Sequence, residues 1–273
     1  MVSTSVPVSV GTDPRHGGRW TSLRAGGREW LWHRAEPRRA GAVPGDPFAD
    51  AGGLEECVPT VRGLPDHGDA WSRAWAPGGP EAPAGPVTHT VECPGFRLTR
   101  TLTGRAADGA VIADYRLSAA PGYRFVWAAH ALLEVSPQGR VALPGGSAGR
   151  LYPDGGAAWT PFAWPRAGDT ALDRLGPDDG TALGAVVDAG QATVHDGPDR
   201  LRFTLEAEGQ PVSVALWRNL RGFPEEAPYR SIGVEPMLGR VFDLAAAGEG
   251  DAAHVPASGE AVWRLTVTAA TTP

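Results

Sequence analysis

The chain has 273 residues with a formal net charge of −6, and all 25 of its basic side chains are arginine. Without clustered positive charge it lacks the usual basis for binding nucleic acid, and without lysine it cannot form a lysine Schiff base or a lysine-type phosphate loop. Glycine and proline are abundant, at 37 and 26 residues, and helices tolerate both poorly. We therefore expect an all-β protein that forms a single domain over residues 1–273.

The predicted elements, in chain order, are strands separated by glycine- and proline-rich turns. Arg19–Leu23 and Arg28–Trp32 flank a pair of glycines and predict a hairpin. The stretches Glu36–Gly53 and Ala76–Pro86 are typical of loops, and long loops in a compact β domain often form sites. Segments in which apolar and polar side chains alternate predict half-buried strands; they cover residues 96–103, 111–117, 192–195, 201–205, 212–217 and 262–268.

The N-terminal segment and the cysteines bear on the compartment of the protein. The first eight residues lack the charged start and the apolar run of a signal peptide. No apolar stretch approaches ~18 residues, so we expect no membrane span and no membrane partner. Cys57 and Cys93 are isolated from one another, and free thiols are the simpler interpretation. Together these features predict a cytoplasmic protein.

Glu235 is the first candidate for a reacting group. It follows the strand-like Ile232 and Val234 and directly precedes Pro236. Proline biases the preceding residue toward extended backbone and cannot donate to a strand ladder. We therefore expect Glu235 to stand at the rim of a sheet, where its side chain could be presented to a ligand.

Two histidines far upstream also have local sequences that suit a site. His67 lies on a predicted turn among acidic residues, and an exposed turn histidine is an equal alternative. His130 lies in the apolar run Phe125–Val135, where a core histidine with one hydrogen bond is the competing interpretation. Paired with a carboxylate, an imidazole in such a low-dielectric wall becomes a candidate general acid with a shifted pKa.

Aromatic and amide side chains supply candidate binding groups. Trp217 and Asn219 share one predicted strand end, where they would offer a stacking face beside hydrogen-bonding groups, a mixture that sugar sites use. A core tryptophan is the alternative for Trp217. Trp71 lies in a turn-rich segment, and several rings in such segments favour a lined groove.

Four motifs carry a resemblance to a known family. They are Gly-Gly-Leu-Glu-Glu-Cys-Val-Pro-Thr from Gly52, Pro-Asp-His-Gly-Asp-Ala-Trp-Ser from Pro65, Trp-Ala-Ala-His-Ala-Leu-Leu from Trp127 and Ile-Gly-Val-Glu-Pro from Ile232. In this order they resemble the aldose 1-epimerase, or galactose mutarotase, superfamily, and most of all its shorter bacterial members. The resemblance implies a large antiparallel β-sandwich, with a sugar bound in an open cleft on a concave sheet.

The resemblance also implies roles for individual residues. Glu235 matches the base that takes the proton from the anomeric hydroxyl, His130 the acid that protonates the ring oxygen, and His67 a histidine that binds and polarises the substrate near it. We expect Glu235 and His130 to face one another across the width of a pyranose ring.

Further binding residues follow from the same motifs. Glu56 is expected to line the cleft, together with Trp71. The arginine often found beside the family's cleft is Arg73, Arg62 or another arginine of the chain, and the usual aspartate for sugar hydroxyls has no assigned counterpart.

The leading hypothesis is an aldose 1-epimerase that interconverts the α and β anomers of a free or modified aldose by acid–base ring opening. Such chemistry needs one acid and one base and no cofactor, and the dispersed histidines offer no short-spaced pair of metal ligands. The alternatives are a carbohydrate-binding protein without catalysis and a different sugar-modifying enzyme on the same scaffold. We expect a small-molecule sugar as the partner and a monomer or homodimer.

Overall fold

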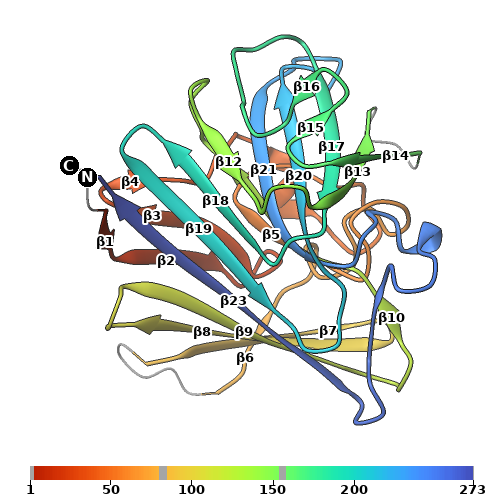
Figure 1. Cartoon of the computed structure of the whole chain (residues 1–273). Coiled ribbons are helices and arrows are strands. Elements are labelled where there is room, and N and C mark those ends of the chain that lie inside the picture. Colours follow the sequence, from red (N-terminus) through yellow and green to blue (C-terminus); the bar gives the residue numbers. More distant parts are fainter. Residues whose placement is uncertain (1–2, 80–84, 154–157, 273) are drawn as a thin grey trace.

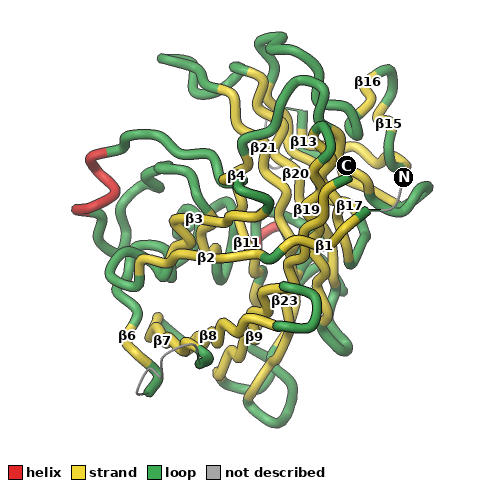
Figure 2. Tube along the Cα trace, turned by 90° about the vertical axis from the view of Figure 1, so that its left-hand side faces the viewer, coloured by secondary structure: helices red, strands yellow, loops and turns green. Residues whose placement is uncertain are grey.

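Antiparallel β-sheet makes up nearly all regular structure in the computed structural model, which describes residues 3–79, 85–153 and 158–272. Two large sheets form the body of the molecule (Figure 1). Helix in the described residues is limited to two short 3-10 turns, η1 (Pro37–Gly41) and η2 (Leu244–Ala246) (Figure 2), and none of it is long and apolar enough to cross a membrane. The all-β expectation is confirmed. Residues 80–84 of the predicted loop Ala76–Pro86 lie outside the described ranges.

The smaller sheet has nine strands and contains both the first and the last strand of the chain. In spatial order its strands are β12 (Arg140–Ala142), β18 (Gln191–Asp196), β19 (Asp199–Glu206), β23 (Glu260–Thr271), β9 (Ala110–Ala119), β8 (Phe96–Arg105), β7 (Val87–Cys93) and β6 (Ala76–Pro77), with β1 (Thr4–Val6) paired to β23. The pairing of β1 with β23 brings the two ends of the chain side by side (Figures 1 and 2).

The larger sheet has twelve strands. In spatial order they are β16 (Thr170–Ala171), β15 (Arg166–Ala167), β14 (Thr160–Ala163), β13 (Ala148–Tyr152), β17 (Ala182–Val187), β20 (Val212–Leu220), β21 (Arg230–Leu238), β11 (Trp127–Leu133), β5 (Leu54–Cys57), β3 (Arg19–Ala25) and β2 (Val8–Asp13), with β4 (Arg28–Glu29) paired to β3. A separate short ribbon joins β10 (Arg124–Phe125) to β22 (Ala253–His254).

The predicted strands are present in the structure. The expected hairpin is β3–β4, which turns at Gly26 and Gly27, but its second strand ends at Glu29 and not at Trp32. The six alternating segments lie in β8, β9, β18, β19, β20 and β23. Their alternation reflects a core on one face of each sheet, because successive side chains on a strand point to opposite faces. Trp127 and Val234 of the larger sheet share this core with Leu98, Phe203 and Leu265 of the smaller one.

A buried ion pair links the two sheets inside the core. Arg100 on β8 and Glu56 on β5 are 1% and 0% exposed, and their Nη1 and Oε1 atoms lie 2.7 Å apart. Glu56 also accepts hydrogen bonds from the Tyr115 hydroxyl and from Trp127 Nε1, each at 2.8 Å. The Arg100 guanidinium lies 4.9 Å from the Trp75 ring centroid, a cation–π distance. The charge of Glu56 is thus compensated on every side.

Removing one partner of this pair should destabilise the fold strongly. We expect Arg100→Ala to lower the free energy of unfolding by about 3–5 kcal/mol, because the carboxylate of Glu56 is left buried without its cation. Urea denaturation followed by tryptophan fluorescence measures the loss.

Arg97→Ala is the matched control on the same strand. Arg97 pairs with Glu92 in the open, where both side chains are more than half exposed, and such surface pairs contribute about 0–1 kcal/mol. An Arg100→Ala protein no less stable than Arg97→Ala would contradict the role of the buried pair.

Candidate functional site

The candidate site lies on the outer face of the twelve-stranded sheet, at β11 and β21. On β11, Ala129 and Ala131 point into the core between the sheets, so His130 points to the opposite face. On β21, Val234 lies in the same core, and Glu235 therefore also faces outward. The alternation of two neighbouring strands thus places an imidazole and a carboxylate on one surface.

Glu235 lies in the middle of β21 and not at the rim of a sheet, which corrects the expectation drawn from Pro236. β21 pairs with β20 along its whole length, through Pro236 and beyond. On the other side, its ladder with β11 is interrupted between Gly233 and Met237. Because proline has no N–H to donate, this interruption lets it occupy a central strand.

His130 and Glu235 are in direct contact at the interruption. His130 Nδ1 lies 2.9 Å from Glu235 Oε1, an ion-pair distance without the angles of an aligned hydrogen bond. The two side chains are only 9% and 2% exposed. They stand side by side and not across the width of a sugar ring, so that expectation is also corrected. Among the described residues, Glu235 Oε2 has no hydrogen-bond partner.

The contact changes the acidity of His130. Burial is the largest single effect and disfavours the charged imidazole, but the carboxylates of Glu235, Asp50 and Glu55 together outweigh it, Glu235 most of all, and the pKa of His130 is raised. The ring therefore holds its proton more tightly than a free histidine. When protonated, a buried imidazole beside a cavity is suited to donate a proton to a ligand.

His67 is fixed beside His130 by two partners. Its ring stacks on Phe48 with centroids 3.7 Å apart and 12° between the planes, and its Nδ1 lies 2.9 Å from Asp66 Oδ1. The other oxygen of Asp66 accepts a hydrogen bond from the backbone N–H of Phe48 at 3.3 Å. The ring centroids of His67 and His130 are 5.2 Å apart.

His67 has the opposite protonation tendency to His130. Burial lowers the pKa of His67; the hydrogen bond with Asp66 opposes this in part, and the charge of His130 adds to the lowering. A neutral ring that donates from Nδ1 to Asp66 presents Nε2 as an acceptor. In its neutral form, His67 can therefore accept a hydrogen bond from a ligand hydroxyl through Nε2.

A cavity of about 200 Å³ opens beside the three side chains. It is small next to the roughly 300–1,000 Å³ of pockets for drug-sized ligands, so it suits a ligand of monosaccharide size. Besides the groups already described, it is lined by Asp50 and Arg62 and by the rings of Trp217, Phe223, Tyr229 and Phe242.

Several lining residues carry no motif that marks them in the sequence. Tyr229 stacks on Trp32 with ring centroids 4.6 Å apart, and its hydroxyl donates a short hydrogen bond to Asp50. Phe48 and Asp50 both lie in the loop Glu36–Gly53. The length of that loop indicated a site-forming segment, but no residue pattern singled out these two.

Glu55 is a second carboxylate on the same face of the sheet. The β5–β11 register sets it opposite His130. The Arg39 guanidinium donates two hydrogen bonds to its carboxylate in a bidentate arrangement, with Nε 2.8 Å from Oε1 and Nη2 3.0 Å from Oε2. Both oxygens of Glu55 thus accept hydrogen bonds from a permanent cation, whereas Glu235 Oε2 has no hydrogen-bond partner among the described residues.

Three predicted binding residues lie away from the cavity, which corrects their assignment. Glu56 points into the core, because successive side chains on β5 alternate between faces and Glu55 lies on the outer face. Trp71 is 1% exposed and packs edge-on against Phe48 at 5.0 Å between centroids, behind the cavity wall. Arg73 pairs with Asp69 at 3.6 Å. Of the two candidate arginines, Arg62 is the one that lines the cavity.

The two predicted residues on β20 differ in their relation to the cavity. Trp217 lines it, in edge contact with Phe223 at 5.9 Å between centroids. Asn219 is fully buried and acts indirectly. Its Oδ1 accepts from the N–H groups of Gly222 and Phe223 at 3.0 Å each, and its Nδ2 donates to the Phe223 carbonyl at 2.8 Å. Asn219 therefore fixes the loop that carries Phe223 to the cavity.

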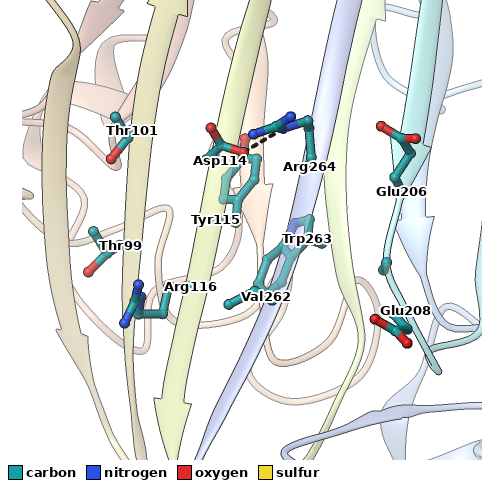
Figure 3. A pocket seen from close by; sticks show the side chains of 11 residues that line it. Thr99, Thr101, Asp114, Tyr115, Arg116, Glu206, Glu208, Val262, Trp263 and Arg264 are labelled. Carbon is teal, nitrogen blue, oxygen red and sulfur yellow. Dashed lines mark hydrogen bonds and ion pairs between the residues drawn. The ribbon is translucent and has the colours of Figure 1, made fainter.

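A larger hollow lies on the nine-stranded sheet, with a volume of about 730 Å³ (Figure 3). Asp114 and Arg264 pair across it at 2.7 Å, and about half of each side chain is exposed. Exposed pairs of this kind contribute little energy, and the hollow lacks a buried acid–base pair like that of His130 and Glu235. We therefore place the candidate site at the smaller cavity. No group of three or more histidine, cysteine or acidic side chains in the described parts of the chain could hold a metal ion.

Comparison with known proteins supports the fold. No protein-family profile and no curated protein sequence matches the chain. Solved structures do match over nearly the whole chain. A provisionally assigned aldose 1-epimerase from Escherichia coli K12 has a TM-score of 0.73 and 12% identity, covering 99% of each chain. A galactose mutarotase-like protein from Lactobacillus casei has a TM-score of 0.66 and 16% identity, covering 98% of this chain and 100% of the other. A galactose mutarotase related enzyme from Lactobacillus acidophilus has a TM-score of 0.64 and 12% identity, covering 97% of each.

The chain therefore has the galactose mutarotase-like fold, as its sequence motifs predicted. At identities of 12–16%, this likeness establishes the architecture of the chain.

The two histidines of the site should titrate in opposite directions. We expect His130 to lose its proton above, and His67 below, the ordinary histidine pKa of 6.5, because Glu235 holds the first charge and burial opposes the second. Two-dimensional NMR of the imidazole nitrogens across pH measures both. A His67 that titrates above His130 would contradict this electrostatic picture.

Proposed function

We propose that the protein is an aldose 1-epimerase that interconverts the anomers of a small aldose. One observation carries the proposal: the buried carboxylate of Glu235 lines the cavity directly beside an imidazole with a raised pKa, and its Oε2 has no hydrogen-bond partner among the described residues. The fold and the names of its structural relatives agree with this function.

The side-by-side arrangement of acid and base fits the reaction. The anomeric hydroxyl and the ring oxygen are bonded to the same carbon, so the groups that serve them must be neighbours. Glu235 takes the hydroxyl proton while His130 donates a proton to the ring oxygen, and the bond between the anomeric carbon and the ring oxygen breaks. Rotation of the aldehyde and the reverse transfers close the ring as the other anomer. Both side chains regain their starting protonation, so the cycle consumes no proton.

The rest of the cavity supplies binding. His67 would accept a hydrogen bond from a sugar hydroxyl through Nε2, and Asp50 would accept another. Trp217 offers a ring against which the apolar face of a pyranose can pack. Arg62 stands at the exposed end of the cavity, where it can reach a polar substituent of the ligand.

Loss of the base should abolish mutarotation. We expect Glu235→Gln to lower the enzymatic rate roughly 10²–10⁴-fold, the range for removal of a general base. The assay follows freshly dissolved α-D-glucose and α-D-galactose by polarimetry, and NMR exchange spectroscopy extends it to other free aldoses.

Glu260→Gln is the matched control, because Glu260 is exposed and pairs with Arg116 on the surface. It should retain the parental rate. An unmodified protein that binds these sugars without accelerating anomer exchange would contradict the proposal and support carbohydrate binding without catalysis. A Glu235→Gln protein with the parental rate would refute the role of Glu235.

A further inference from the structure

Gly233 lies two residues before Glu235 on the same face of β21. A Cβ atom built on Gly233 would come within 2.4 Å of Glu235 Oε1 and within 2.8 Å of Trp217 Cβ. The carboxylate of Glu235 therefore folds back along its own strand and lies against the bare Cα of Gly233.

The backbone at this position does not itself require glycine. Gly233 is absent from the residues with positive φ, and it is paired to Trp217 on β20 as part of a regular antiparallel ladder. Glycine weakens the interior of a strand, so its presence calls for a reason. The carboxylate of Glu235 and the Cβ atom of Trp217 both occupy the space that a side chain would need.

The oxygen that rests on Gly233 is the one that meets His130. Oε1 lies 2.9 Å from His130 Nδ1, while Oε2 is left without a partner among the described residues. One carboxylate orientation thus produces both the ion pair and the free oxygen. A side chain at position 233 would displace Oε1 and disturb both.

We propose that Gly233 is a positioning residue that seats the carboxylate of Glu235 beside His130. The inference rests on the proposed function only where it concerns the rate of anomer exchange. The seat itself is a property of the folded protein, and it can be tested without a substrate.

His130 reports directly on the position of the carboxylate. The charged or titratable groups that face it are Glu235 from β21, Glu55 from β5, Asp50 from the loop before β5 and the ring of His67. Only Glu235 lies against Gly233. In Gly233→Ala we therefore expect the pKa of His130, measured by NMR, to fall toward the value found in Glu235→Gln.

Gly184→Ala is the matched control for this titration. Gly184 is paired to Trp217 from the other side, on β17, and lines the same cavity. A Cβ atom there would lie 3.0 Å from the Phe242 ring and makes no contact with Glu235. The pKa of His130 should be the same in Gly184→Ala as in the unmodified protein.

The catalytic readout separates positioning from binding. If the proposed function holds, Gly233→Ala should lower kcat roughly 10²-fold, the effect of a misplaced catalytic group, with a smaller change in KM. Added to Glu235→Gln, the same substitution should cause no further loss, because the group that it displaces is already disabled.

Three results would overturn the inference. The first is a His130 pKa in Gly233→Ala equal to that of the unmodified protein. The second is a further loss of rate when Gly233→Ala is added to Glu235→Gln. The third applies if Gly233→Ala does not fold. The double variant Gly233→Ala/Glu235→Ala, which removes the carboxylate, should then fold. If the double variant also fails to fold, Trp217 and not the carboxylate requires the glycine. A lack of mutarotation in the unmodified protein would refute the proposed function and leave the titration test intact.

Discussion

The position of β5 is the constraint on which the site depends. Its two adjacent carboxylates point to opposite faces of the sheet, and both are buried. Glu56 pairs with Arg100 in the core, and Glu55 pairs with Arg39 on the outer face. A slip of one residue would turn each acid away from its cation, and buried charges without partners are strongly unfavourable. Because β5 pairs with β11, this fixed register also fixes where His130 stands.

The electrostatics of the site follow from that placement. Two histidines with ring centroids 5.2 Å apart have pKa values shifted in opposite directions. The carboxylate of Glu235 helps to raise the pKa of His130, whereas burial lowers the pKa of His67 and its hydrogen bond to Asp66 Oδ1 opposes this only in part. Divergent pKa values in neighbouring titratable groups are a mark of functional sites. One ring is thereby suited to give a proton and the other to accept a hydrogen bond.

Local patterning predicted the strands, and the motifs predicted the three side chains that meet at the cavity. The errors have physical causes. Pro236 suggested a sheet rim, but an interrupted ladder accommodates it in a central strand. Glu56 was predicted to line the cleft, but it faces the core and its neighbour Glu55 faces outward. Sequence spacing does not reveal which face of a strand is the core. Asp50 and Tyr229 meet only through folding, so no local pattern could mark them.

The residues that line the cavity come from two kinds of structure, central strands and surface loops. His130 and Glu235 lie on central strands that are paired on both sides, whereas Phe48, Asp50 and Phe223 reach the cavity from loops. Surface loops tolerate substitution and insertion better than buried strands. Substitutions in these loops can therefore reshape the cavity wall without moving the strands that hold His130 and Glu235.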